Sequence, residues 1–96
     1  MISLTIIFDK GLVRCELYIP DNKSLYYDLE NEKEFIESKL DYELEWNPLV
    51  NKKASRIITE KKLDLNDSSN WENGFLWLME TSKEYKNCLF QSNKQD

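Results

Sequence analysis

The sequence contains no histidine and only two cysteines, Cys15 and Cys88. Histidine is the commonest general base in enzymes and a common zinc ligand, and two cysteines alone cannot complete a structural zinc site. We therefore expect no catalytic residue, no metal ion and no cofactor. Because an intracellular chain keeps its thiols reduced, we expect two buried free thiols rather than a disulfide.

Glycine, proline and long apolar runs are also scarce. Two Gly and two Pro among 96 residues argue against disorder, so we expect one domain over residues 1–96 with a frayed tail at 91–96. No apolar run reaches the length of a membrane span, and residues 2–8 lack the basic leader of a signal peptide. These absences predict a cytoplasmic protein without membrane contact.

The residues that are abundant are apolar and acidic. Hydrophobic residues make up 41% of the chain, which is enough for a packed core. Eighteen acidic residues against 13 basic residues give a net charge of −5. This balance argues against non-specific binding of nucleic acid by the whole surface.

Alternating apolar and polar residues predict four strands, at 1–9, 12–19, 42–46 and 54–60. Lys10 and Gly11 form a short turn that joins the first two strands as a hairpin. In the second strand, Arg14, Glu16 and Tyr18 point away from the apolar side. The inward face of the fourth strand is ambiguous, because apolar residues occur on both of its sides.

Two amphipathic segments predict helices over residues 23–40 and 71–90. Asp21 or Asn22 can cap the first helix, and residues 66–69 can cap the second. The second helix has one apolar stripe, made of Trp71, Phe75, Leu78, Tyr85 and Leu89. The order ββαββα predicts an α+β fold, in which a four-stranded antiparallel sheet carries both helices on one face.

Acidic residues are concentrated between residues 28 and 45, a segment that contains eight acidic residues and only two lysines. A helix face of this charge could contact a basic partner, and the candidate residues are Glu30, Glu34, Glu37 and Asp41. A solvated helix face explains the same pattern, and both readings stay open.

Basic residues form a second candidate region, made of Lys52, Lys53, Lys61 and Lys62 with Arg56 between them. Such a patch could bind a phosphate backbone, with Tyr42 or Trp46 stacking on bases. These lysines could equally balance the acidic helix. Residues 60–62 match the Glu-x-Lys motif of metal-dependent nucleases. In a chain that is 32% charged, a match to so short a motif is expected by chance.

Several stretches, taken in order, resemble domain-of-unknown-function family 4268. They are VRCELYI (13–19), LEW (44–46), KASRI (53–57), Trp71 and the pair at 77–78. Members of that family often form the C-terminal part of bacterial chains whose N-terminal part resembles a restriction-type nuclease. The resemblance covers residues 12–90 and implies an accessory or recognition module in defence or mobile-element systems, with no known activity. Phe75 stands where members often have histidine.

The motif residues Arg14, Glu16, Tyr18 and Arg56 should lie together on the open face of the sheet. We expect this face to be a binding surface, although a structural Arg–Glu ladder explains the same residues. The leading hypothesis is a non-enzymatic protein-binding module that binds a nuclease or another defence component, or a second copy through the open face. The alternatives are a phage or mobile-element inhibitor that uses the acidic helix, and a nucleic-acid-binding accessory domain.

Overall fold

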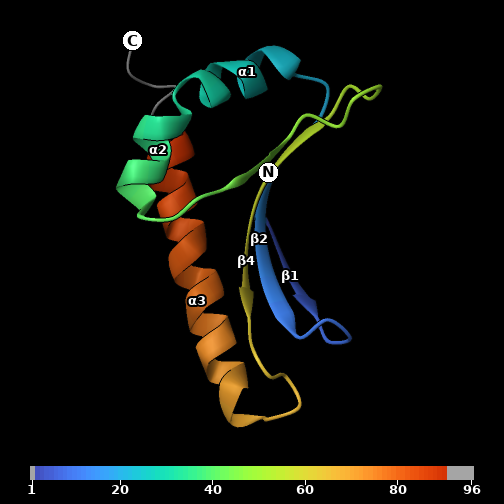
Figure 1. Ribbon diagram of the computed structural model, residues 1–96, viewed down its shortest axis with the longest axis vertical. Coiled ribbons are helices and arrows are strands. Elements are labelled where there is room, and N and C mark those ends of the chain that lie inside the picture. Colours follow the sequence, from blue (N-terminus) through green and yellow to red (C-terminus); the bar gives the residue numbers. More distant parts are fainter. Residues whose placement is uncertain (1, 91–96) are drawn as a thin grey trace.

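The computed structural model describes residues 2–90, without the side chain of residue 90 (Figure 1). The tail expected at 91–96 lies outside the described residues. The elements follow in the order β1 (Ile2–Ile7), β2 (Leu12–Ile19), α1 (Lys23–Asn31), α2 (Lys33–Leu40), β3 (Glu45–Asn47), β4 (Ser55–Lys62) and α3 (Ser69–Tyr85). A π-helical turn, η1 (Lys86–Phe90), continues α3. The α+β fold and the expected β1–β2 hairpin are confirmed.

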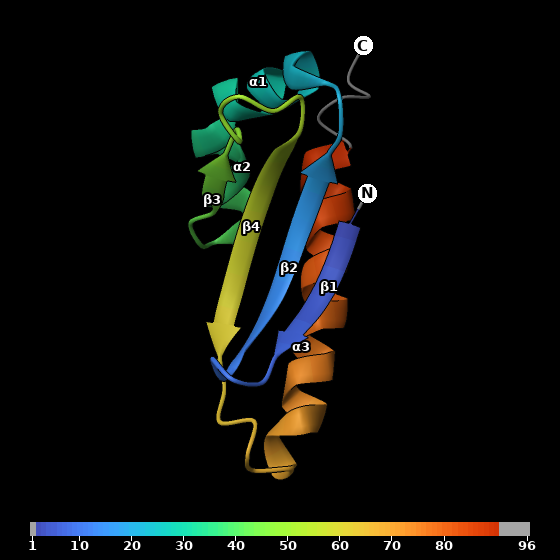
Figure 2. The same cartoon turned by 90° about the vertical axis from the view of Figure 1, so that its right-hand side faces the viewer.

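The four strands form one antiparallel sheet in the order β1-β2-β4-β3 (Figure 2). The turn between β1 and β2 needs glycine, because Gly11 has a φ of +61° and a Cβ there would lie 3.1 Å from the carbonyl oxygen of Leu63. Ser55, Ile57 and Thr59 pair with core-facing residues of β2, so this side of β4 faces the helices. The register thereby settles which face of the fourth strand is inward.

The helix expected over residues 23–40 is in fact two helices, which is a correction. Asn22 caps α1, since its Oδ1 accepts a hydrogen bond from the backbone N–H of Leu25 at 3.0 Å. The chain leaves helical geometry at Glu32, where φ is −103° and ψ is 18°. Asn31, a poor helix former, precedes the break. The bend buries both Leu29 and Ile36 around one core.

All three α-helices lie on the same face of the sheet (Figure 1). α3 lies behind β1 and β2 in Figure 2, while α1 and α2 cover the end of the sheet near β3. The core between these layers is made of Cys15, Leu17, Ile19, Tyr26, Leu29, Ile36, Leu40, Leu44, Ile57, Tyr85 and Leu89. The described helices include none long and apolar enough to cross a membrane.

The apolar stripe expected along α3 is buried only in its second half. Leu78, Tyr85 and Leu89 are buried, as expected, and the Tyr85 hydroxyl lies within hydrogen-bond distance of the carbonyl oxygens of Cys15 and Ile57. Trp71 and Phe75 are about half exposed, so the apolar stripe is not buried along its whole length. The reason is that the first turns of α3 reach past the ends of the strands (Figure 2), so that only the end of the β1–β2 hairpin and the loop before α3 approach them.

Candidate functional site

The open face of the sheet carries two ion pairs between β2 and β4. Arg14 Nε donates to Glu60 Oε2 at 2.6 Å, and the two residues are directly opposite in the register. Arg56 donates to both carboxylate oxygens of Glu16, at 2.6 and 3.0 Å. These hydrogen bonds to Glu16 are the largest cause of the raised pKa of Arg56.

The structure therefore brings together the four residues expected on this face, since Tyr18 is the register partner of Arg56. Sequence reasoning missed Glu60 as the partner of Arg14. The long charged side chains help to cover Leu12 and Ile58, which are buried although none of the helices within residues 2–90 lies on this face. The charges on this face largely satisfy one another, as the ladder alternative expects.

The four candidate acidic residues do not form a uniform free surface. Glu37 accepts hydrogen bonds from the backbone N–H of Leu44 at 2.7 Å and from Trp46 Nε1 at 3.0 Å. Glu30 accepts one from the Tyr26 hydroxyl at 3.2 Å. Asp41 ends α2 in the left-handed conformation, with φ of 66°. Glu34 is exposed in the first turn of α2.

The candidate basic residues do not form one patch. Lys52 and Lys53 lie in the loop before β4, whereas Lys61 and Lys62 end that strand. A strand of eight residues is roughly 25 Å long, so β4 holds the two pairs far apart. Within residues 2–90, no group of three or more acidic or thiol side chains is placed to hold a metal ion.

Neither cysteine is poised for nucleophilic chemistry. Cys15 is buried, and this burial, with the charge of Glu16 as a smaller cause, raises the pKa of its thiol to about 12. Cys88 is partly buried, and burial likewise raises its pKa, with Glu84 as the second cause. Neither cysteine forms a disulfide within the described residues, and a raised thiol pKa lowers the fraction of reactive thiolate at neutral pH.

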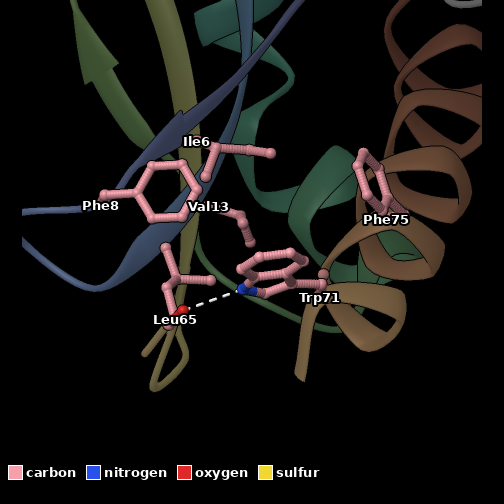
Figure 3. A pocket seen from close by; sticks show the side chains of 7 residues that line it. Ile6, Phe8, Val13, Leu65, Trp71 and Phe75 are labelled. Carbon is pink, nitrogen blue, oxygen red and sulfur yellow. Dashed lines mark hydrogen bonds between the residues drawn. The ribbon is translucent and has the colours of Figure 1, made fainter. Parts of the chain in front are cut away.

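A groove of about 250 Å³ opens between the end of the β1–β2 hairpin and the start of α3 (Figure 3). We call it the apolar groove, and its lining residues are Ile6, Phe8, Val13, Leu65, Trp71, Gly74 and Phe75. The rings of Phe8 and Trp71 meet edge to face, with centroids 6.5 Å apart. No charged side chain is among the lining residues.

The loop between β4 and α3 fixes the position of Trp71. Trp71 Nε1 donates to the carbonyl oxygen of Leu65 at 2.9 Å, the dashed line in Figure 3. The N–H group is the only polar group of the indole, and this hydrogen bond occupies it. Trp71 therefore offers only apolar surface to the groove. Ser68 is the N-cap of α3 but its side chain makes no capping hydrogen bond, whereas Asp67 accepts a hydrogen bond from the backbone N–H of Ser69 at 3.0 Å.

Gly74 lets α3 approach β2 closely at the floor of the groove. A Cβ at this position would lie 3.3 Å from Leu63 Cδ1 and 3.4 Å from Val13 Cγ1, at the tight limit of van der Waals contact. The small residue therefore keeps the helix near the sheet while Trp71 and Phe75, on either side of it, stand at the rim.

The rim is unusually exposed for large apolar side chains, since Phe8 is 63% exposed and Phe75 is 56% exposed. Contiguous exposed apolar patches on small proteins are often binding sites. Sequence reasoning did not find this groove. The apolar residues at 2, 4, 6 and 8 and the stripe of the last helix were visible, but nothing in the sequence placed β1 at the margin of the sheet.

Comparisons with known proteins place the chain in a family. No curated protein and no solved structure matches it significantly. The sequence model of one family matches residues 1–92, which includes both the hairpin and the helix that form the apolar groove. The chain therefore belongs to the DUF4268 family, a domain of unknown function.

Proposed function

We propose that this domain is a non-enzymatic protein-binding module whose apolar groove receives a hydrophobic side chain of a partner protein. The observation that carries the proposal is the pairing of an apolar groove with a half-exposed aromatic rim, formed by Phe8, Trp71 and Phe75. Protein interfaces are centred on apolar pockets of this kind, which are filled by anchor residues of the partner.

The chemistry of the lining favours a protein over a small molecule. Metabolite sites contain a few placed polar groups that orient the ligand, and catalytic sites need titratable or nucleophilic groups. The lining of this groove offers only hydrocarbon and aromatic surface, with the Trp71 N–H already bonded to Leu65. Its volume of about 250 Å³ suits one or two apolar side chains.

The resemblance noted in the sequence supports a cytoplasmic role beside a bacterial nuclease-based defence or mobile-element system. On this proposal the partner is a nuclease or a protein that works with one. The acidic-inhibitor and nucleic-acid alternatives have less support, because Glu37 is bonded within the chain and β4 separates Lys53 from Lys61.

Affinity capture from the lysate of the native host tests the proposal with two matched variants. Phe75→Glu places a charge at the rim of the apolar groove, while Phe35→Glu places the same charge on α2. The two phenylalanines are 56% and 57% exposed, so neither change disturbs a buried core. Retained proteins are quantified by mass spectrometry for the wild type and for both variants.

The expected result is a protein retained in stoichiometric amount by the wild type and by Phe35→Glu, and lost with Phe75→Glu. Its identity as a nuclease or a nuclease-associated protein would support the defence role. Equal retention by all three chains, or no retained protein at all, would contradict the proposed use of the groove.

A further inference from the structure

β1 is an edge strand without the usual protection against pairing with another chain. Its six residues, ISLTII, contain neither a charged residue nor proline. Soluble proteins commonly protect exposed edges with lysine, proline, bulges or very short strands. The opposite edge, β3, follows that rule, because it has three residues and begins with Glu45.

The helix-facing row of β1 is incompletely covered. Leu4 and Ile6 are 47% and 37% exposed, although their register partners Cys15 and Val13 are buried. On α3, Met79 lies one turn beyond Phe75 and is also exposed, so the apolar surface continues along the helix. The uncovered surface thus consists of one strand edge and the neighbouring side of one helix.

We infer that this edge is a homodimer interface, in which β1 pairs antiparallel with β1 of a second copy. The pattern of β1 favours a second copy as the occupant, because residues 2–6 read apolar, polar, apolar, polar, apolar in either direction, as antiparallel pairing of two copies requires. A chain with net charge −5 repels its own copies over most of its surface, but β1 contributes no charge to such a contact. A two-fold axis is also the commonest symmetry of soluble oligomers.

The pattern of β1 favours one register, centred on Leu4. Residues directly opposite in an antiparallel pair share a face, so this register sets Leu4 against Leu4 and Ile2 against Ile6 in the row that faces the helices. On the other face it sets Ser3 against Thr5, a pair that can form a cross-strand hydrogen bond. Apolar residues therefore pair with apolar residues on the face toward the helices, and polar residues pair with polar residues on the other face.

The same register places the helices of both copies on one side of an eight-stranded sheet. The two β2 strands would be three strand spacings apart, roughly 14 Å. Because α3 lies behind β1 and β2, the α3 helices of the two copies would be farther apart than the 8–10 Å of directly packed helices. In the proposed dimer, the exposed side chains Phe75 and Met79 of both copies would fill that space. Ile6 and Phe75 belong to both the apolar groove and this interface, but the inference goes beyond the proposed function, because sedimentation of the isolated chain tests the dimer without any partner protein.

Sedimentation velocity tests the inference with a charge-swap pair. Leu4→Lys and Leu4→Glu each set like charges opposite one another in the proposed register, and Leu4 is half exposed, so the monomer should still fold. Val50→Lys, at a 77% exposed loop position, is the control. Circular dichroism checks the fold of each variant. The double variant Ser3→Lys with Thr5→Lys, which sets lysines opposite one another on the other face of the strand, replaces any Leu4 variant that fails to fold.

We expect the wild type and Val50→Lys to sediment as dimers and each Leu4 variant alone to sediment as a monomer. An equimolar mixture of Leu4→Lys and Leu4→Glu should restore the dimer, because opposite charges then face each other across the two-fold axis. A monomeric wild type, a Leu4→Lys variant or a Ser3→Lys, Thr5→Lys double variant that remains dimeric, or a mixture that remains monomeric would overturn the inference.

Discussion

The ring of Phe8 stands edge-on to the indole of Trp71, with ring centroids 6.5 Å apart and an interplanar angle of 83°. Phe8 belongs to the turn of the first hairpin, and Trp71 to the first turn of the last helix. The contact therefore ties the two ends of the apolar groove together, and the groove exists only when hairpin and helix are docked.

The first prediction concerns the Phe8–Trp71 contact. Edge-to-face aromatic pairs contribute about 0.5–1.5 kcal/mol beyond the area they bury, so Phe8→Ala should lower the free energy of unfolding by about 1 kcal/mol. Val50→Ala is the control, because Val50 is exposed in a loop. Urea denaturation measures both, and equal effects would show that the aromatic contact is not stabilising.

The second prediction compares the two ion pairs of the open sheet face. The Glu16 side chain is 9% exposed and accepts two bonds from Arg56, whereas Arg14 and Glu60 are 23% and 32% exposed. Glu16→Gln should lower the free energy of unfolding by about 1–3 kcal/mol, because Arg56 loses a charged hydrogen-bond partner whose side chain is mostly buried. Glu60→Gln should cost less than about 1 kcal/mol. The reverse order in urea denaturation would contradict the burial argument.

The third prediction concerns the hydroxyl of Tyr85, which reaches the carbonyl oxygens of Cys15 and Ile57 on adjacent strands at 3.3 and 3.2 Å. Tyr85→Phe keeps the buried ring and removes the donor, so we expect a loss of about 1 kcal/mol. Tyr42→Phe, which removes an exposed bond to Glu84, should cost less. Thermal unfolding of both variants gives the comparison, and a neutral Tyr85→Phe would show that this bond contributes nothing.

The fourth prediction is a loss of stability at alkaline pH. Burial, followed by the charge of Glu16, raises the pKa of Cys15 from 9.0 to about 12, and burial also raises the pKa of Tyr85. The folded state then holds protons that the unfolded chain releases, so stability is complete below pH 9 and falls as pH rises from 9 to 12. Cys15→Ala should make this fall shallower. An unchanged slope in urea denaturation across that pH range would contradict the assignment to Cys15.

The sequence predicted the hairpin and the two faces of β2, because a strict alternation from Val13 to Ile19 leaves one choice of faces. It did not predict the break at Glu32, since the apolar residues on both sides fit one continuous helix. It placed the third strand at 42–46, whereas β3 covers only Glu45–Asn47. Glu37 accepts hydrogen bonds from Leu44 and Trp46, and such contacts between distant residues have no local signal.

The candidate site was predictable only in part. The opposite charges of Arg14, Glu16 and Arg56 predicted a cluster on the open face, and the structure places them there. The apolar groove could not be foreseen, because the same stripe residues Trp71 and Phe75 would be buried if the sheet extended beneath them. Strand order decides this point, and strand order is set by long-range pairing rather than by local pattern.

Hydrogen–deuterium exchange of the domain, free and bound to the partner captured by affinity, tests the central claim most directly. A protein-binding groove predicts slower exchange on binding at residues 6–8 and 71–75, where the hairpin and α3 meet. Protection confined to residues 14–18 or 52–62 would contradict the account, because it would place the partner on the open sheet face or on the basic residues around β4.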